Sequence, residues 1–204
     1  MFASKTILKR LMKKTFKNGG LKIASMADED YDVWIYIGGS YWDFWCLENF
    51  LDKEIKATIV ELTGQLPKTG EAYKATKGEN QMVMLSTVPD FEVAAKTMVI
   101  PYLSTALYQT QGDTLLNFLQ GPHGHVIAVN SVFTNLVFEG IGTEKREDGE
   151  IAASGPYAAD DFESVLWKNN VGGLRAYAHY PNEKNEEDEF WRDLENIKIP
   201  TKLY

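Results

Sequence analysis

Two histidines separated by a single residue, His123 and His125, are the most direct candidates for chemistry in this sequence. If both lie in one extended strand, their side chains point to the same face, as two ligands of one metal ion must. Further ligands of such a site would come from His179, Asp160, Asp161 or Glu163. The alternative is a solvated turn, because His123 stands between Pro122 and Gly124. We favour the turn, and a metal-dependent hydrolase using the His123/His125 pair is the alternative.

Other catalytic signatures are absent from the sequence. There is no G-x-S-x-G motif, and the single cysteine, Cys46, has no sequence neighbour that would lower its pKa. The segments "GGSYWDF", "GPHGH" and "NVGGLR" lack the spacing of phosphate-binding loops and are better explained as turns. Asp160 and Asp161 follow "SGPYAA" and are explained as a cap. We therefore favour a function without catalysis, and we assign no catalytic residue, metal ligand or cofactor.

The segment "YDVWIYIGGSYWDFWC", residues 31–46, predicts a β-hairpin. Two alternating runs flank Gly38-Gly39, and a pair of glycines favours a two-residue turn. This register makes one apolar face, which we expect to lie on the core with Cys46 as a buried, reduced thiol. The expected cross-strand pairs on that face are Ile37 with Ser40, Ile35 with Trp42, Val33 with Phe44 and Tyr31 with Cys46.

The opposite face of the hairpin combines aromatic rings with two carboxylates. Its residues are Asp32, Trp34, Tyr36, Tyr41, Asp43 and Trp45. If this face were buried, both carboxylates would need cationic partners, because an unpaired buried charge is costly. A chain with 21 Lys and Arg against 29 Asp and Glu has few cations to spare. We therefore predict that this face is partly exposed and that it is a binding surface.

Composition narrows the class of protein. The chain has 204 residues, of which 44% are hydrophobic and 25% charged, so it has enough apolar material for a core. The net charge of −8 disfavours phosphate backbones as partners over most of the surface. No segment has the roughly 18 consecutive apolar residues of a membrane span, and the first 25 residues lack the apolar region of a secretory signal. One cysteine allows no internal disulfide, so we expect a cytoplasmic protein.

The N-terminal segment predicts a basic amphipathic helix. It contains six lysines and arginines and no acid, with Ser4 as the N-cap and Gly19-Gly20 at the end. One interpretation is a helix docked on the core with a solvated lysine face. The others are a basic helix that binds a surface and an organelle transit peptide. Contacts with nucleic acid or with an acidic partner would use Lys9, Arg10, Lys13, Lys14 and Lys17.

Two further helices are indicated by their caps. "NFLDKEIKATIVELTGQLP" has apolar residues at helical spacing, Asp52 as the N-cap, and Gly64 with Pro67 at its end. "HVIAVNSVF" predicts a strand that leads into a helix beginning at Ser131, with Asn130 as the cap.

Strands account for most of the remaining segments. We predict two strands around residues 78–80, a strand ending at Ile100, and two strands around residues 169–173. A short helix at 103–108, a helix or turn in "DTLLNFLQ" and a polar loop or mobile hairpin at 140–161 complete the order. The pattern predicts an α+β fold with antiparallel sheets and with helices packed on one side.

Three parts are expected along the chain. They are the basic amphipathic helix 1–20, an α+β domain 21–181 and an acidic C-terminal tail 182–204. The segment 183–195 has seven acids against two bases. "DFWCLENFLDKEIKATIVE" and "HVIAVNSVFTNLVFEG" each predict a strand running into a helix. A duplication would explain this similarity and would divide the domain into halves 21–88 and 89–181; chance similarity is the alternative.

A resemblance to known proteins rests on residues 121–181. Their order is strand "HVIAVN", helix "SVFTNLV", a polar loop with "SGP", strand "SVLWKN", a turn and strand "LRAYAHYP". This order resembles the closing half of a sliding-clamp domain. The lysine-rich first helix and the "ATKGENQM" hairpin resemble small accessory proteins of phages and prophages. Clamps bind DNA through Lys and Arg on their helices, and "SVFTNLV" has neither, so no functional residue is carried over.

These observations predict a non-catalytic, acidic protein-binding protein of phage or mobile-element type that acts on a host or phage protein machine. Anti-defence or anti-CRISPR-like inhibition is one form of this function, because acids steer a basic partner and exposed Trp and Tyr anchor it. The alternative is a sliding-clamp-like replication accessory whose N-terminal helix contacts DNA or polymerase. A homo-oligomer in which this helix docks on another acidic copy is also considered.

Overall fold

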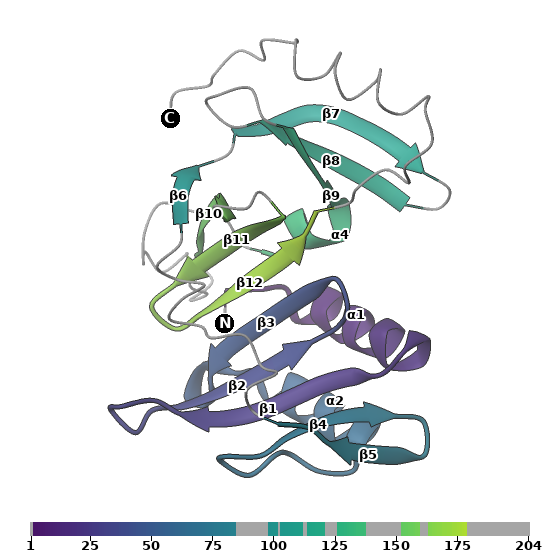
Figure 1. Cartoon of the computed structure of the whole chain (residues 1–204), viewed down its shortest axis with the longest axis vertical. Helices are drawn as coiled ribbons and strands as arrows, with labels where there is room; N and C mark the ends of the chain where they lie inside the picture. The colour runs from purple at the N-terminus through teal and green to yellow at the C-terminus, as the bar shows by residue number, and fades with distance from the viewer. Residues whose placement is uncertain are drawn as a thin grey trace.

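Two antiparallel sheets and several helices make up the fold (Figure 1). The computed structural model describes residues 2–84, 98–101, 103–111, 114–120, 126–137, 152–159 and 163–178. Among these residues, the helices are α1 (Lys5–Asn18), the 3₁₀ turn η1 (Glu48–Phe50), α2 (Lys53–Thr63) and the short α4 (Ser131–Thr134). The predicted α+β class with antiparallel sheets is confirmed.

In the described part of the chain, the large sheet has nine strands and the small sheet has three. The large sheet contains β1 (Leu21–Ala27), β2 (Val33–Gly38), β3 (Trp42–Leu47), β4 (Ala72–Thr76), β5 (Glu79–Met82), β6 (Met98–Pro101), β10 (Ser154–Ala159), β11 (Ser164–Asn169) and β12 (Gly172–Tyr177). The small sheet contains β7 (Leu103–Gln111), β8 (Thr114–Gln120) and β9 (Val126–Asn130). In space the large sheet follows the order β5-β4-β1-β2-β3-β12-β11-β10-β6.

The pairing of β3 with β12 joins the early part of the chain to the late part (Figure 1). Strands β1 to β5 belong to the predicted half 21–88 and lie together in the large sheet. Strands of the predicted half 89–181 are divided between the two sheets. A duplication of the two halves stays a prediction, and the predicted tail 182–204 lies outside the described residues.

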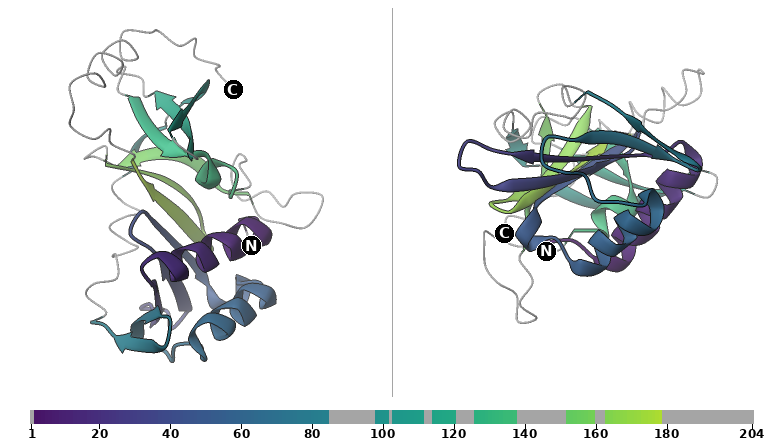
Figure 2. Two further views of the ribbon diagram at one scale, coloured as in Figure 1. Left: turned by 90° about the vertical axis from the view of Figure 1, so that its right-hand side faces the viewer. Right: turned by 90° about the horizontal axis from the view of Figure 1, so that it is seen from below.

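Both long helices cover the same face of the large sheet (Figure 2). Leu8 and Met12 of α1 and Ile55 and Ile59 of α2 are fully buried. They pack in one core cluster with alternate residues of the strands, including Ile23, Ile35, Ile37, Phe44, Trp167 and Leu174. The prediction that the helices pack on one side of the sheet is confirmed.

The helix ends follow local sequence signals. The Asp52 side chain accepts a hydrogen bond of 2.7 Å from the Glu54 N–H at the start of α2. Gly64 ends that helix in the left-handed conformation, with φ of 83°. Asn130 caps α4 by accepting from the Val132 N–H at 2.9 Å. Ser4 occupies the N-cap position of α1, as predicted, although its side chain makes no capping bond.

The β2–β3 hairpin has the predicted faces but a different register. Ile37 lies opposite Phe44 and Ile35 opposite Cys46, and the Gly39 N–H donates to the Trp42 carbonyl at 2.8 Å. The turn therefore lies two residues further along the chain than the predicted Gly38-Gly39 turn. The shift relative to the predicted pairs is an even number of residues, and it therefore keeps every strand side chain on its expected face. A physical reason lies at Gly39, where a Cβ would come within 2.8 Å of the Trp42 indole nitrogen.

The space at Gly39 lets the Trp42 indole reach α1. Its Nε1–H donates to the Thr15 hydroxyl over 3.0 Å, a bond that ties the hairpin to the helix. With the turn at Gly38-Gly39, Trp42 would instead lie opposite Ile35, two residue pairs further from the turn.

Two predicted helical segments are strands. Residues 103–108 belong to β7, and "DTLLNFLQ" contains β8. Leu116 and Leu119 of β8 are buried on opposite sides of that strand, in different clusters. A short apolar run with both faces covered has no period of its own, and it is therefore easily mistaken for a helix.

The predicted strand pairs around residues 78–80 and 169–173 are present as β4–β5 and β11–β12. Residues 140–161 were predicted as a polar loop or a mobile hairpin, and the loop alternative is wrong for Ser154–Ala159, which forms β10. This strand pairs with β6 on one side and β11 on the other.

Candidate functional site

A buried hydrogen-bond network centred on Asp43 connects three strands of the large sheet. We call Tyr36, Asp43, Arg175 and Tyr177 the Asp43 cluster. Asp43 accepts from the Tyr36 hydroxyl through Oδ1. Its Oδ2 accepts from Arg175 Nε at 2.9 Å, from Arg175 Nη2 at 2.5 Å and from the Tyr177 hydroxyl at 3.1 Å. The cluster therefore ties β2, β3 and β12 together across the junction between distant parts of the chain.

Two glycines make room for aromatic rings on this face. A Cβ at Gly38 would collide with the Tyr36 phenol, and a Cβ at Gly173 would collide with the Trp45 indole. Gly173 lies directly opposite Trp45 in the β3–β12 pair. The rings therefore cover the glycines, and Tyr36 and Trp45 are 1% and 5% exposed.

The predicted exposure of this face is wrong for Tyr36, Asp43 and Trp45, all of which are buried. Arg175 supplies the cation that Asp43 needs, in an ion pair of 2.5 Å. Sequence reasoning missed Arg175 because 132 residues separate it from Asp43. With the charge paired, burial of the carboxylate is no longer prohibitive.

The other predicted binding-surface residues are more open. Trp34 is half-buried and Asp32 is exposed. Tyr41, in the turn between β2 and β3, is 72% exposed. Tyr31 was expected on the core face opposite Cys46 and is instead 88% exposed, outside the strand. The predicted surface is therefore divided into a buried centre and exposed ends.

The surroundings of Tyr36 and Arg175 fix the protonation states of these two side chains. Burial, reinforced by the Asp43 carboxylate, raises the pKa of the Tyr36 hydroxyl above its ordinary value. Burial alone would lower the pKa of Arg175, but Asp43 raises it overall. The tyrosine stays protonated and the arginine charged, so this arrangement suits a structural ion pair better than proton transfer.

A second aspartate, Asp28, organises the turn between β1 and β2. We call residues 28–32 the acidic turn. Asp28 Oδ1 accepts from the N–H groups of Asp30 at 3.0 Å and Asp32 at 2.9 Å. Its Oδ2 accepts from Trp34 Nε1 at 2.8 Å, and this bond lowers the pKa of Asp28. A backbone bond from the Tyr31 N–H to the Asp28 carbonyl, 3.1 Å, closes the turn.

Tyr31 stands out of the acidic turn in a strained conformation. Its φ is 63°, the one positive φ of a non-glycine residue in the described part of the chain. The left-handed region costs a residue with a Cβ about 1 to 2 kcal/mol. The ring gains little burial in return, since it is 88% exposed. An exposed aromatic ring that is held in place by a strained backbone is a candidate for contact with a partner.

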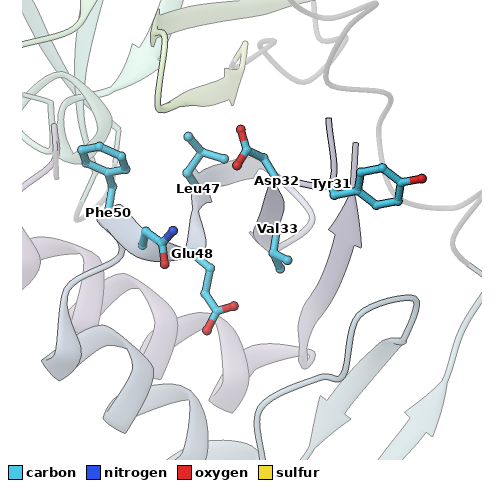
Figure 3. A pocket seen from close by; sticks show the side chains of 7 residues that line it. Tyr31, Asp32, Val33, Leu47, Glu48 and Phe50 are labelled. Carbon is cyan, nitrogen blue, oxygen red and sulfur yellow. The ribbon is translucent and has the colours of Figure 1, made fainter. Parts of the chain in front are cut away.

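A groove of about 260 Å³ begins beside Tyr31, and we call it the end groove. Figure 3 shows Tyr31 and Phe50 at its opposite ends, with the carboxylates of Asp32 and Glu48 between them. Phe50 is 43% exposed, and Glu48 accepts a hydrogen bond of 3.1 Å from Lys56. The lining residues are Tyr31, Asp32, Val33, Leu47, Glu48, Asn49 and Phe50.

Helix α1 is docked on α2 by ion pairs. Lys5 and Lys9 both donate to Glu54, at 2.6 and 2.9 Å, and Lys13 donates to Glu61 at 2.8 Å. The hydrogen bonds from Lys5 and Lys9 lower the pKa of Glu54 to about 2. The predicted docking of this helix on the body of its own chain is confirmed.

The cations predicted to contact a partner are therefore of two kinds. Lys9 and Lys13 face acids of α2. Arg10, Lys14 and Lys17 are exposed and have no acidic partner within the described residues. The spacing of these three, at i, i+4 and i+7, places them along one side of the helix.

The histidine site cannot be built from the described residues. His123, His125, His179, Asp160 and Asp161 lie outside them, and Glu163 is exposed. In the described part of the chain, no group of three His, Cys, Asp or Glu side chains is placed to hold a metal ion.

The single cysteine is inert where it lies. Cys46 is fully buried in the core cluster, and burial raises the pKa of its thiol to about 12. The thiol therefore stays protonated at neutral pH and is a poor nucleophile.

Comparison with known proteins gives no relatives: no protein-family model, no curated protein and no solved structure matches this chain. Among the described helices, none combines the length and the apolar character that crossing a bilayer requires.

Proposed function

We propose that this chain is a non-catalytic protein-binding protein whose end groove and acidic turn receive a basic segment of a protein partner. The observation that carries the proposal is the ordering of the acidic turn around Asp28, which holds Tyr31 in a strained, exposed position. A turn that is already ordered before binding loses less conformational entropy when the partner binds.

The side chains of the end groove suit such a partner. Tyr31 and Phe50 supply rigid apolar surface at its two ends, and aromatic anchors are the usual centres of binding energy. Asp32 adds a negative charge that has no cationic partner within the described residues, beside three further acids of the turn. Acids of this kind steer a basic partner toward the site, and salt weakens this electrostatic attraction.

As part of this proposal, the chain is a cytoplasmic protein of phage or mobile-element type that acts on a host or phage protein machine. An anti-defence or anti-CRISPR-like inhibitor is the form that the net charge of −8 suits best, since many nucleic-acid-processing machines present basic surfaces. The resemblance of the first helix and the hairpins to phage accessory proteins points the same way.

The test is a pull-down from the source cell, read by mass spectrometry, with matched variants. Tyr31→Ala with Phe50→Ala removes both anchors of the end groove. Tyr41→Ala is the control, because it removes another largely exposed tyrosine, from the other end of the same hairpin. We expect a protein that wild type and the control retain and the double variant loses. Equal retention by all three would contradict the proposal.

A second candidate function is a replication accessory that contacts DNA or polymerase through α1. The exposed Arg10, Lys14 and Lys17 favour it. DNA binding should then weaken steeply with salt, and changing these three to Ala should reduce the slope of log K against log salt by about 3. Changing Lys5 and Lys9 to Ala is the control, because Glu54 already occupies them. Absence of salt-sensitive binding would remove this candidate.

A further inference from the structure

The end groove lies where strands β2 and β3 separate. The last residue pair of their ladder is Trp34 with Leu47. Beyond it, the chain before β2 belongs to the acidic turn, and the chain after β3 becomes η1. Asp28 fixes the acidic turn, and the Leu51 N–H donates to the Glu48 carbonyl at 3.2 Å in η1. The groove between these two walls (Figure 3) therefore has its shape before a partner binds.

The size of the groove limits what it can hold. Its volume is about 260 Å³. Pockets that enclose a drug-sized ligand or a cofactor have volumes of roughly 300 to 1,000 Å³. A single long side chain of a protein needs less room than such a ligand. The occupant that fits the groove is therefore one side chain of a protein partner.

The groove carries one carboxylate that is not neutralised. Its two acids are Asp32 and Glu48, and the Glu48 carboxylate pairs with Lys56 Nζ at 3.1 Å. The backbone N–H of Asp32 donates to Asp28, but the Asp32 carboxylate has no ion pair or hydrogen bond within the described residues. One unpaired carboxylate favours a ligand group with one positive charge.

Most of the remaining lining is apolar or aromatic. Val33 and Leu47 are half-buried, and the rings of Tyr31 and Phe50 are 88% and 43% exposed. An aliphatic stem gains from contact with such side chains while its charged end stays near a carboxylate. A cation is also attracted to the face of an aromatic ring. Together with Asp32, this lining suits the side chain of an arginine or a lysine.

We propose that the end groove binds one arginine side chain of the partner in preference to a lysine. This inference rests on the proposed function, and it names the group that the basic segment inserts. A guanidinium forms two parallel hydrogen bonds to one carboxylate, such as that of Asp32. Because it is planar and weakly hydrated, it also stacks on an exposed ring such as that of Phe50. An ammonium is more strongly hydrated and has no planar face, so it gains less from the same lining.

Titration of the full chain with three peptides tests this inference. Each peptide has blocked ends and one central residue between pairs of glycines, and the central residue is arginine, lysine or citrulline. Citrulline has nearly the shape of arginine without its charge. Binding is measured from the backbone amide resonances of the protein by two-dimensional proton–nitrogen NMR, which also shows that the protein is folded.

We expect the arginine peptide to shift the resonances of residues 31–33 and 47–50, with a Kd on the order of 1 to 10 mM for a contact made by one side chain. The lysine peptide should bind about threefold more weakly, or worse. The citrulline peptide should cause no shift. Unchanged resonances with the arginine peptide overturn the inference, and so does equal binding by the lysine or the citrulline peptide.

Two substitutions in the acidic turn separate the groove from the general negative charge around it. Asp32→Asn removes the unpaired charge and keeps the backbone bond to Asp28, so the arginine peptide should bind at least about tenfold more weakly. Asp30→Asn is the matched control, because Asp30 is an exposed acid of the same turn that does not line the groove. Its Kd should stay within about twofold of wild type. Equal losses in the two variants would show general attraction in place of a site and would overturn the inference.

The result is separable from that of the pull-down. If the arginine peptide fails to bind while the variant with Tyr31→Ala and Phe50→Ala loses a partner, this inference is overturned and the proposed function stands. If the arginine peptide binds as expected while that variant retains every partner, the preference of the groove for arginine stands and the proposed function is contradicted.

Discussion

Asp43 and Asp28 each accept hydrogen bonds from several donors, aromatic side chains among them, but they lie in opposite environments. Asp43 is 3% exposed and pairs with a guanidinium, whereas Asp28 is exposed and holds an open turn through two backbone N–H groups and an indole. The same chemistry thus stabilises the sheet in one region and shapes a surface loop in the other. The buried site should govern stability, and the exposed site should govern recognition.

The largest effect should come from removing the cation of the Asp43 cluster. Arg175→Met leaves a buried carboxylate without its charge partner, and we expect the free energy of unfolding to fall by about 3 to 5 kcal/mol. Lys13→Met is the control, since it removes a cation from an exposed pair and should cost about 0.5 kcal/mol. Urea unfolding measures both, and equal losses would show that burial of the pair does not matter.

A smaller loss should follow from filling the space beneath Trp45. Gly173→Ala places a Cβ against the indole ring, and overpacking of this kind costs about 1 to 3 kcal/mol. Gly19→Ala is the matched control, because nothing lies within 4 Å of a Cβ there. If both variants melt at the wild-type temperature, Trp45 has room to move and the face is less tightly packed than described.

Releasing the acidic turn should change local order more than global stability. Asp28→Ala removes the acceptor of two N–H groups and of Trp34, so we expect faster amide hydrogen exchange across residues 28–34 and a shift in tryptophan emission. Because the pKa of Asp28 is lowered from 3.8, its contribution is complete above that value and is lost as the pH falls through the lowered pKa. Unchanged exchange would mean that other bonds order the turn.

The smallest effect on stability should come from Tyr31. Tyr31→Gly relieves the positive φ while losing an exposed ring, so we expect stability within about 1 kcal/mol of wild type. Thermal melting checks this result. A large loss of stability would show that Tyr31 contributes to stability as the buried residues of the Asp43 cluster do. It would contradict the contrast between that cluster and the acidic turn.

The sequence allowed the local features of this fold to be predicted. The two faces of the hairpin follow from the alternation of side chains in a strand, and they survive the wrong register because the shift is even. The caps at Asp52 and Asn130 are also local signals. Strand β8 was missed because a short apolar run shows no period that separates strand from helix.

The candidate site was harder to predict. The pairing of Asp43 with Arg175 depends on the β3–β12 contact, which no local pattern reveals. Tyr31 adopts a positive φ, although the sequence has neither Gly nor Asn, the residue types that usually indicate this conformation, at this position. One signal was available: the side chain of an aspartate in a polar turn often accepts from the N–H two residues ahead, and in "DEDYD" this would have marked Asp28 as the start of an ordered turn.

The most direct test of the central claim is the affinity of a partner identified by the pull-down, measured by calorimetry with wild type, Tyr31→Ala and Tyr41→Ala. Loss of an aromatic anchor costs about 1.4 kcal/mol or more, which is at least a tenfold weaker Kd. We therefore predict at least tenfold weaker binding by Tyr31→Ala, at an unchanged melting temperature, and wild-type binding by Tyr41→Ala. Equal affinities for all three proteins, or equal weakening by both variants, would contradict the assignment of recognition to the acidic turn and the end groove.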